Sequence, residues 1–504
     1  MSGQVLLGRD GAAEVTRRCD VVVVGTGAGG AMAARELARR GLEVIALEGG
    51  AYHRARDFSQ REDEMLGALY QDAGARATDD LAIRVLQGRG VGGSTVHNTN
   101  LCKRIPDALL GRWALPGWSP VDLAPHYAAT ERELGVRPMG PAEENAHNGL
   151  FRRGCEALGW RGGYLSHNRD GCRQSGFCEL GCSFDAKLNA LRVLAPQAVR
   201  AGATIYADTR VDRVRVEGGH AVGVSATLLG EGGRPRGRMT VHSRAVVLAA
   251  SATASQALCE RSAIADPRGR GARSLRLHPG VAVAGVFPAE VRAWQGIPQS
   301  YECTEWLSFD AGSDRRAWLV PAFAHPVGTA AFLSVAPSQH AKIMSLYPRL
   351  CVVAAMIHDE SGGRAYAEDE RVRIDYELTA GDRAQLALGM DKAARVLFAA
   401  GAERVLLPFA RAIEVGRAAD LPPALARGVR ALDPSLVSVH PHGSLPMGAD
   451  ARSPLDPEGR HRSTRGLWVA DGSIFPTSIG VPPQLSIYTF ARRIAGFAAD
   501  ELRG

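Results

Sequence analysis

The feature that most constrains the fold is a glycine-rich turn at residues 25–30, placed between an apolar segment and an amphipathic one. Its sequence, GTGAGG, fits the pattern G-x-G-x-x-G. The preceding residues 19–24 (CDVVVV) predict a buried parallel strand, and residues 28–40 predict a helix that stops at Gly41. A second apolar run at residues 42–47 predicts the next strand. A strand, helix and strand over about thirty residues is the size of a nucleotide-binding crossover, so we expect an α/β protein with a parallel sheet.

The residues of this turn have the properties needed to hold a dinucleotide. Gly25 permits a tight turn, Gly27 lets the backbone approach a pyrophosphate, and Gly30 allows close packing of the helix on the strand. Gly29 belongs to the same turn. Glu48 ends the second strand, where a carboxylate can bind both hydroxyls of an adenosine ribose and would repel a 2′-phosphate. We therefore expect a Rossmann-like domain with a doubly wound parallel sheet that binds FAD or NAD rather than NADP.

The choice between FAD and NAD needs a second motif, and a glycine-rich segment, GRGVGGST, lies at residues 88–95. Together with HPHGSLPMG at residues 440–448 and LWVADGS at residues 467–473, it resembles the glucose-methanol-choline (GMC) family of flavoprotein oxidoreductases over nearly the whole chain. The resemblance implies FAD as the cofactor and oxidation of an alcohol, with a hydride passing to the flavin N5. It also implies that the flavin and its phosphates lie along the second glycine-rich segment, whose predicted cofactor-binding residues are Arg89, Gly92, Gly93 and Ser94.

The same resemblance places the catalytic histidine at His440. An alcohol proton is too weakly acidic to leave unaided, so a base must take it as the hydride departs. The family usually has a second catalytic Asn or His where this chain has Pro482, which has no polar side chain. His442 would point the same way as His440 in an extended segment and is our second catalytic candidate. Tyr488 or Asn98 could instead supply the contact, or His440 could act alone.

Two further residues near the expected flavin carry specific hypotheses. Asp471, with the backbone of Gly472, ends the strand that in the family contacts the ribityl and pyrophosphate portion of FAD, although Asp-Gly is also an ordinary turn signal. His97 follows the glycine pair at the spacing of the histidine that is bonded to the flavin 8α-methyl carbon in choline-oxidase-like members. It either forms that covalent bond, which would raise the reduction potential, or packs beside the dimethylbenzene ring. Asn98, the next residue, is also expected to contact the cofactor.

The chain of 504 residues is too long for one compact core, so we expect two domains. The predicted division is an FAD-binding domain at residues 1–275 with a flavin-contacting loop region at 50–125, an α+β substrate-binding domain at 276–430, and a C-terminal segment at 431–504 that returns to the first domain and carries His440.

Three closely spaced cysteines suggest an alternative redox role. Cys172, Cys178 and Cys182 have a spacing that resembles the iron-sulfur site of bacterial FAD-linked glucose dehydrogenases, but the match is imperfect and no fourth ligand for zinc is evident. We therefore expect no metal and interpret them as thiols. Two alternative functions stay open at this point. One is a lyase or decarboxylase that retains FAD without net redox change, and the other is an electron-relaying dehydrogenase with an iron-sulfur cluster.

Composition bounds the partners and the location. The net charge of +7 is scattered among acids, so nucleic acid is not an expected partner. No segment reads as a membrane span or an export signal, and nine cysteines, an odd number, favour a reducing compartment, so we expect a cytoplasmic protein. The segment at residues 294–306 (WQGIPQSYECTEW) and its apolar surroundings resemble members that oxidise long-chain alcohols. The expected partners are therefore a small-molecule alcohol, which this resemblance favours to be lipophilic, and oxygen or another electron acceptor.

Overall fold

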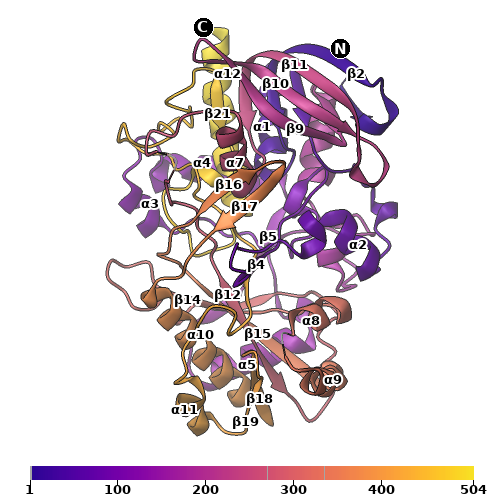
Figure 1. The fold of residues 1–504 in the computed structure, drawn as a ribbon. Coiled ribbons are helices and arrows are strands. Elements are labelled where there is room, and N and C mark those ends of the chain that lie inside the picture. The colour runs from indigo at the N-terminus through magenta and orange to yellow at the C-terminus, as the bar shows by residue number, and fades with distance from the viewer. Residues whose placement is uncertain (1–2, 270, 334) are drawn as a thin grey trace.

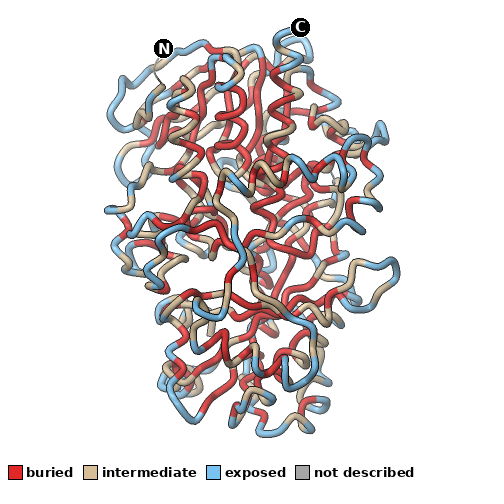
Figure 2. Tube along the Cα trace, turned by 180° about the vertical axis from the view of Figure 1, so that it is seen from behind, coloured by how far each residue is buried: buried red, intermediate tan, exposed pale blue. Residues whose placement is uncertain are grey.

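The computed structural model describes residues 3–269, 271–333 and 335–504. Two sheets lie at opposite ends of the molecule, and both chain termini lie at the end that holds the first sheet (Figure 1). Buried segments run through both parts, while exposed segments follow the outer loops (Figure 2). Within the described residues, no helix combines the length and apolar character needed to cross a membrane.

The first sheet contains the predicted strand–helix–strand unit. Its strand order is β1-β8-β3-β2-β11-β10-β9, with β21 also paired to β11. The pairs β1/β8, β8/β3, β3/β2, β2/β11 and β11/β21 are parallel, whereas β10 pairs antiparallel with β9 and β11. Its strands are β1 (Gln4–Leu7), β2 (Glu14–Val24), β3 (Val44–Leu47), β8 (Thr204–Ala207), β9 (Thr209–Glu217), β10 (His220–Leu229), β11 (Pro235–Leu248) and β21 (Leu467–Val469).

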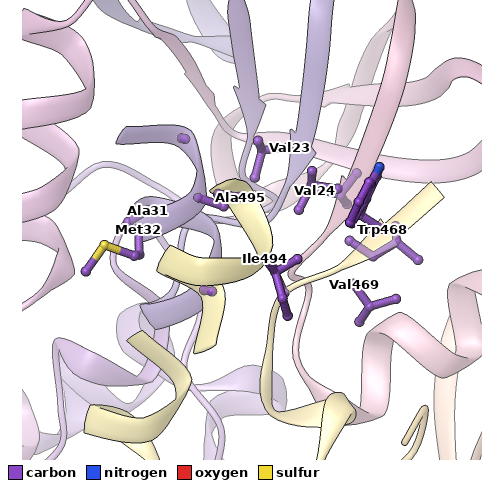
Figure 3. Packing of buried hydrophobic residues seen from close by; sticks show 14 of the residues in the cluster. Val23, Val24, Ala31, Met32, Trp468, Val469, Ile494 and Ala495 are labelled. Atoms are coloured by element: carbon purple, nitrogen blue, oxygen red, sulfur yellow. The ribbon is translucent and has the colours of Figure 1, made fainter. Parts of the chain in front are cut away.

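Helices bury the apolar residues of this sheet. The predicted helix after the glycine turn is α1 (Ala28–Arg39), which packs against the C-terminal helix α12 (Gln484–Arg503). Figure 3 shows Ala31 and Met32 of α1 in one cluster with Ile494 of α12, and the same core includes Val23 of β2. Small side chains on α1 permit this close approach. The remaining helices of this part are α2 (Glu62–Leu69), α3 (Asp107–Trp113), α4 (Pro120–Glu133), α6 (Ala195–Arg200) and α7 (Ala252–Arg261).

The second sheet is mainly antiparallel, with the order β19-β18-β12-β15-β14-β13-β6, and β20 joins β12 to β4. Its strands are β4 (Ile83–Val85), β6 (Gly162–Tyr164), β12 (Gly280–Val286), β13 (Tyr301–Cys303), β14 (Ala317–Pro321), β15 (Leu350–Ile357), β18 (Arg404–Leu407), β19 (Ile413–Val415) and β20 (Leu436–Ser438). Helices α5 (Ala146–Ala157), α8 (Pro326–Phe332), α9 (Pro337–Ser345), α10 (Ala380–Ala399) and α11 (Leu421–Leu425) belong to this part, and the pairs β5 (Val136–Pro138) with β7 (Ser166–Asn168) and β16 (Arg364–Glu368) with β17 (Arg371–Asp375) form two small sheets.

The two faces of the second sheet belong to different hydrophobic cores, because successive side chains of a strand point to opposite faces. Leu319 of β14 and Ala355 of β15 belong to the core that includes Met390 of α10. Their neighbours along the strands, Trp318 and Met356, are cross-strand partners on the other face and belong to a separate small core. The second face is thereby left to line a cavity.

The chain passes between the two parts several times. Strands β4 and β6 come from residues assigned to the first domain, yet they pair within the second sheet, as does β20 of the C-terminal segment. The predicted domain boundary between residues 275 and 276 stays a prediction. The pairing itself shows that non-contiguous segments build the second sheet.

Candidate active site

A cavity of about 320 Å³ lies where the two parts meet. Residues of the glycine turn, with Asp471 and Gly472 shortly after β21, contribute to its lining from the first part, and residues of β14 and β15 contribute from the second. The predicted cofactor-binding residues that line it are Gly25, Gly27, Gly29, Glu48, Gly93, Ser94, His97, Asn98, Asp471 and Gly472, and the predicted base His440 lines it too. The fold therefore brings the N-terminal glycine turn and the C-terminal histidine segment to one cavity.

Two glycines of the first turn have different physical reasons to lack a side chain. A Cβ on Gly29 would lie 1.7 Å from the carbonyl oxygen of Ala470, so close packing requires glycine there. A Cβ on Gly27 would meet only the Cα of Gly93, at 3.9 Å. The space beside Gly27 is therefore unfilled by protein atoms. Gly27 is the N-cap residue of helix α1 and lines the cavity. A backbone that is open at a helix N-terminus suits a pyrophosphate.

Three predicted cofactor residues lie outside the cavity lining. A Cβ on Gly30 would lie 1.9 Å from the carbonyl oxygen of Gly25, so Gly30 serves the packing expected of it. Gly92 has a left-handed backbone with φ of 98°, which glycine adopts at little cost. Arg89 donates its backbone N–H to Leu69. These residues shape the two turns rather than face the cavity.

Glu48 joins the two glycine-rich segments at the end of β3. Its carboxylate accepts hydrogen bonds from the backbone N–H and hydroxyl of Thr26 at 3.1 and 2.8 Å. It also accepts from the backbone N–H groups of Gly50 at 3.0 Å and Gly90 at 3.2 Å. Burial raises the pKa of Glu48, and these hydrogen bonds oppose that shift. A buried acid with four donors is a structural anchor that also faces the cavity.

Asp471 plays a similar part at the end of β21. Its carboxylate accepts from the backbone N–H groups of Ser473 at 2.8 Å and Ser251 at 2.9 Å and from the hydroxyl of Ser255 at 2.6 Å. Burial raises its pKa, and the same hydrogen bonds oppose the shift. Asp471 thus ties the end of β21 to the start of α7, and both Asp471 and Ala252 of α7 line the cavity.

His440 lies against a histidine that sequence reasoning missed. Its Nδ1 is 3.1 Å from the Nδ1 of His278, and the ring centroids are 5.1 Å apart. Burial lowers the pKa of both histidines well below the usual value, and His278 lowers the pKa of His440 further. Both imidazoles are therefore neutral at neutral pH. The His-Pro pair at residues 278–279 matches that at residues 440–441, which was the available signal.

His442 departs from the expectation that it shares the cavity with His440, because its ring is not part of the lining. Its Nε2 accepts the backbone N–H of Ile479 at 3.1 Å, so its Nδ1 carries the proton and donates to the carbonyl of His440 at 2.6 Å. The reason is backbone pairing: His442 exchanges two hydrogen bonds with Arg276, which fixes the segment. Burial lowers the pKa of His442 to about 4. Its geometry is that of a support for the His440 backbone.

The other two candidates for a second polar contact, Tyr488 and Asn98, differ in whether they line the cavity. Tyr488 is fully buried on α12 and is not part of the lining. Asn98 lines the cavity and donates to the side-chain oxygen of Gln484 at 2.8 Å, and Gln484 also lines it. Pro482 borders the cavity without a polar group. Of the three candidates for the second polar contact, His442, Tyr488 and Asn98, only Asn98 lines the cavity where a ligand would lie.

His97 presents a neutral imidazole to the cavity. Its ring lies 4.0 Å from that of Tyr70, centroid to centroid. Burial, with a contribution from the charge of Lys187, lowers the pKa of His97 to about 3. Among the described residues, its buried Nε2 has no hydrogen-bond partner. An unpaired buried nitrogen at a cavity fits a ligand-contacting or ligand-bonded role.

The second sheet contributes an apolar wall to the cavity. Its members come from the face of β14 and β15 opposite the α10 core, with one residue just after β14, and are mostly buried: Trp318, Val320, Ala322, Ala354 and Met356. Within the part of the chain that the structure describes, the lining includes neither lysine nor arginine. This wall suits an uncharged, apolar group.

The three clustered cysteines lie at a separate small cavity. Cys172, Cys178 and Cys182 line it together with Arg169 and Lys187. Lys187 is buried and donates to the carbonyls of residues 96 and 178, each at 2.8 Å, so it links the flavin-side loop to the cysteine turn. Over residues 3–269, 271–333 and 335–504, no group of three or more His, Cys, Asp or Glu side chains is arranged to hold a metal ion.

Comparison with known proteins identifies the family. Two models described as GMC oxidoreductase match residues 66–280 and 361–491, and one described as FAD binding domain matches residues 20–82. An uncharacterized GMC-type oxidoreductase of Mycobacterium tuberculosis is 35% identical over 95% of this chain and 75% of its own length. A long-chain-alcohol oxidase of Arabidopsis thaliana is 29% identical over 99% of this chain and 70% of its own.

A solved structure shows the same fold at lower identity. Pyridoxine 4-oxidase from Mesorbium loti is 17% identical and superposes with a TM-score of 0.69, covering 95% of this chain and 99% of that one. The fold, the cavity and the matched motifs thus agree with one another. The chain belongs to the GMC oxidoreductase family, and it is an FAD-dependent oxidoreductase that acts on CH–OH donors.

Proposed function

We propose that the protein oxidises a lipophilic alcohol, with His440 as the base that takes the hydroxyl proton. The observation that carries this proposal is that a neutral histidine and an apolar wall line the same cavity. A base must be unprotonated before it can accept a proton, and burial keeps His440 in that state at neutral pH.

The residues present fit FAD. Gly27 leaves open space at the N-terminus of α1, and the unpaired Nε2 of His97 borders the same cavity. We assign the first glycine turn to the pyrophosphate, Glu48 to the ribose hydroxyls and Asp471 to the ribityl side. When bound there, FAD supplies the hydride acceptor for the reaction.

The protein's own groups then bind and deprotonate the alcohol. The apolar residues of β14 and β15 hold the hydrocarbon part and exclude water, which strengthens polar contacts at the hydroxyl. Asn98 supplies a polar side chain at the cavity, and His440 accepts the hydroxyl proton at a ring nitrogen. His442 holds the His440 backbone through its Nδ1–H.

The lipophilic substrate class has two supports. The lining lacks a cationic side chain, within the described residues, that would pair with an acidic substrate. In addition, several relatives between 26% and 29% identical are long-chain-alcohol oxidases.

Oxygen or another electron acceptor completes the cycle. The nine cysteines are all free in the structure, which supports the proposed cytoplasmic location.

The test is anaerobic reduction of the purified flavoprotein by a series of alcohols. We expect loss of flavin absorbance with the rate rising from ethanol to octanol and dodecanol, because each buried methylene adds about 0.8 kcal/mol of transfer free energy. Reduction by ethanol as fast as by dodecanol would remove the lipophilic assignment. Failure of every primary, secondary and cyclic alcohol to bleach the flavin would remove the oxidation itself.

A further inference from the structure

The ring of His440, which lines the cavity, lies against the ring of the fully buried His278. Their Nδ1 atoms are 3.1 Å apart, which is hydrogen-bonding distance. Two imidazole nitrogens can form such a bond only when one carries a hydrogen and the other offers a lone pair. Because burial lowers the pKa of both rings, the neutral pair has one proton on this axis.

The placement of the rings indicates the direction of this hydrogen bond that suits catalysis. His440 lines the cavity, whereas His278 is fully buried and is not part of the lining. If His440 donates from Nδ1, its Nε2 has the lone pair needed to accept a proton. His278 then carries its own proton on Nε2, which is buried without a hydrogen-bond partner among the described residues.

His278 is held in place at an energetic cost. Its φ of 48° is left-handed, a conformation that is strained for a non-glycine residue. The carboxylate of Asp359 accepts the backbone N–H groups of Leu277 at 3.0 Å and His278 at 3.2 Å. Hydroxyls of Ser478 and Tyr376 donate to the same carboxylate. Strain that a buried network maintains is commonly found at functional sites.

We propose that His278 is the positioning residue for His440. It accepts the hydrogen bond from Nδ1 of His440, selects the tautomer whose Nε2 lone pair is free, and stabilises the imidazolium that forms when His440 takes the hydroxyl proton. His440 is then the base and His278 is the group that orients it, as in other catalytic networks in which the base is oriented by a neighbouring side chain. The other titratable groups that face the pair are His442, His358 and Asp359. This inference rests on the proposed function of His440.

A matched pair of variants tests the role. Asn and Leu have nearly the same size and shape, but only Asn has an oxygen that can replace Nδ1 as the acceptor, and Asn also tolerates a left-handed backbone. We expect His278→Leu to slow anaerobic flavin reduction about tenfold or more, with KM and FAD content unchanged, and His278→Asn to restore most of the rate. Equal rates in His278→Leu and wild type would overturn the proposal, as would equally slow Leu and Asn variants.

A second readout does not depend on turnover. In protein labelled with ¹⁵N-histidine, we expect an Nδ1-protonated ring, distinct from that of His442, that disappears in His440→Gln, is retained in His278→Asn and is lost in His278→Leu. Its absence from the wild type, or its persistence in His278→Leu, contradicts the inference. Thermal unfolding and FAD content identify any variant that fails to fold. If the tautomer behaves as expected but no alcohol reduces the flavin, the proposed function fails while the hydrogen bond stands.

Discussion

The carboxylate of Glu48 accepts a hydrogen bond from the backbone N–H of Gly90 at 3.2 Å, across 42 positions of the chain. The same carboxylate holds Thr26 of the first glycine turn. One buried acid therefore connects both glycine-rich segments that border the cofactor cavity. The acid that the sequence assigns to a ribose also sets the separation of the two segments that would enclose it.

We expect Glu48→Gln to weaken FAD binding and destabilise the fold. The amide replaces one acceptor oxygen with a donor that faces backbone N–H groups, and leaving buried donors unpaired costs about 1–3 kcal/mol. Denaturant unfolding and FAD titration of the apoprotein measure the two effects. The exposed neighbour Glu43→Gln is the control and should change stability by less than about 0.5 kcal/mol. Matching results for the two variants would show that Glu48 is not an anchor.

Two alanine substitutions in the first turn should fail in different ways. Gly27→Ala has room for its Cβ in the protein and should fold, but its methyl group enters the space assigned to the pyrophosphate, so FAD affinity should fall. Gly29→Ala places a Cβ 1.7 Å from the carbonyl oxygen of Ala470 and should destabilise the protein itself. Thermal unfolding of both apoproteins and FAD titration of each separate the two effects. Full FAD affinity in Gly27→Ala would contradict the assigned pyrophosphate position.

We expect His440→Gln to slow flavin reduction by about 10²–10⁴-fold while FAD remains bound, because general base catalysis contributes about this factor. Stopped-flow reduction under anaerobic conditions measures the rate, and the absorbance spectrum reports the FAD content. A loss of FAD instead of rate would mean that His440 supports the cofactor rather than the chemistry.

The pH dependence follows from the protonation state of His440. Burial lowers the pKa of His440 well below its usual value of about 6.5, and His278 and His442 lower it further. The base form is the active one and persists above that lowered pKa, so the rate of reduction by an uncharged alcohol should be constant near neutral pH. It should fall only as the pH drops through the lowered pKa. An acidic limb centred at or above 6.5 would show that His440 is not held neutral by burial.

The covalent flavin hypothesis predicts a simple outcome for His97. Its Nε2 is unpaired in the described structure, and its ring is neutral because burial lowers its pKa to about 3. A neutral, unpaired nitrogen is the form that can bond to a flavin carbon. We expect acid-precipitated wild-type protein to retain yellow flavin in the pellet and His97→Ala to release it. Flavin in the wild-type supernatant would assign His97 to packing beside the ring.

Much of the first domain could be predicted because its signals are local. The turn at residues 25–30, the flanking strands and the helix are set by neighbours within one crossover, and the structure shows them as β2, α1 and β3. His440 was identified from its immediate sequence and lines the cavity. The orientation of the His442 ring differs from the one expected from alternation along an extended segment, because that pattern does not include the backbone pairing with Arg276, and its catalytic role stays a prediction.

The sequence by itself determined the cofactor turn, the acid that anchors it and the histidine segment, since each depends on residue type and short-range spacing. Only the tertiary structure decided that His278 meets His440 across 162 positions, and that one face of β14 and β15 lines the cavity. The physical reason is that these contacts arise from sheet pairing between distant segments, and neither the turn nor the histidine segment contains information about which distant strand will pair beside it.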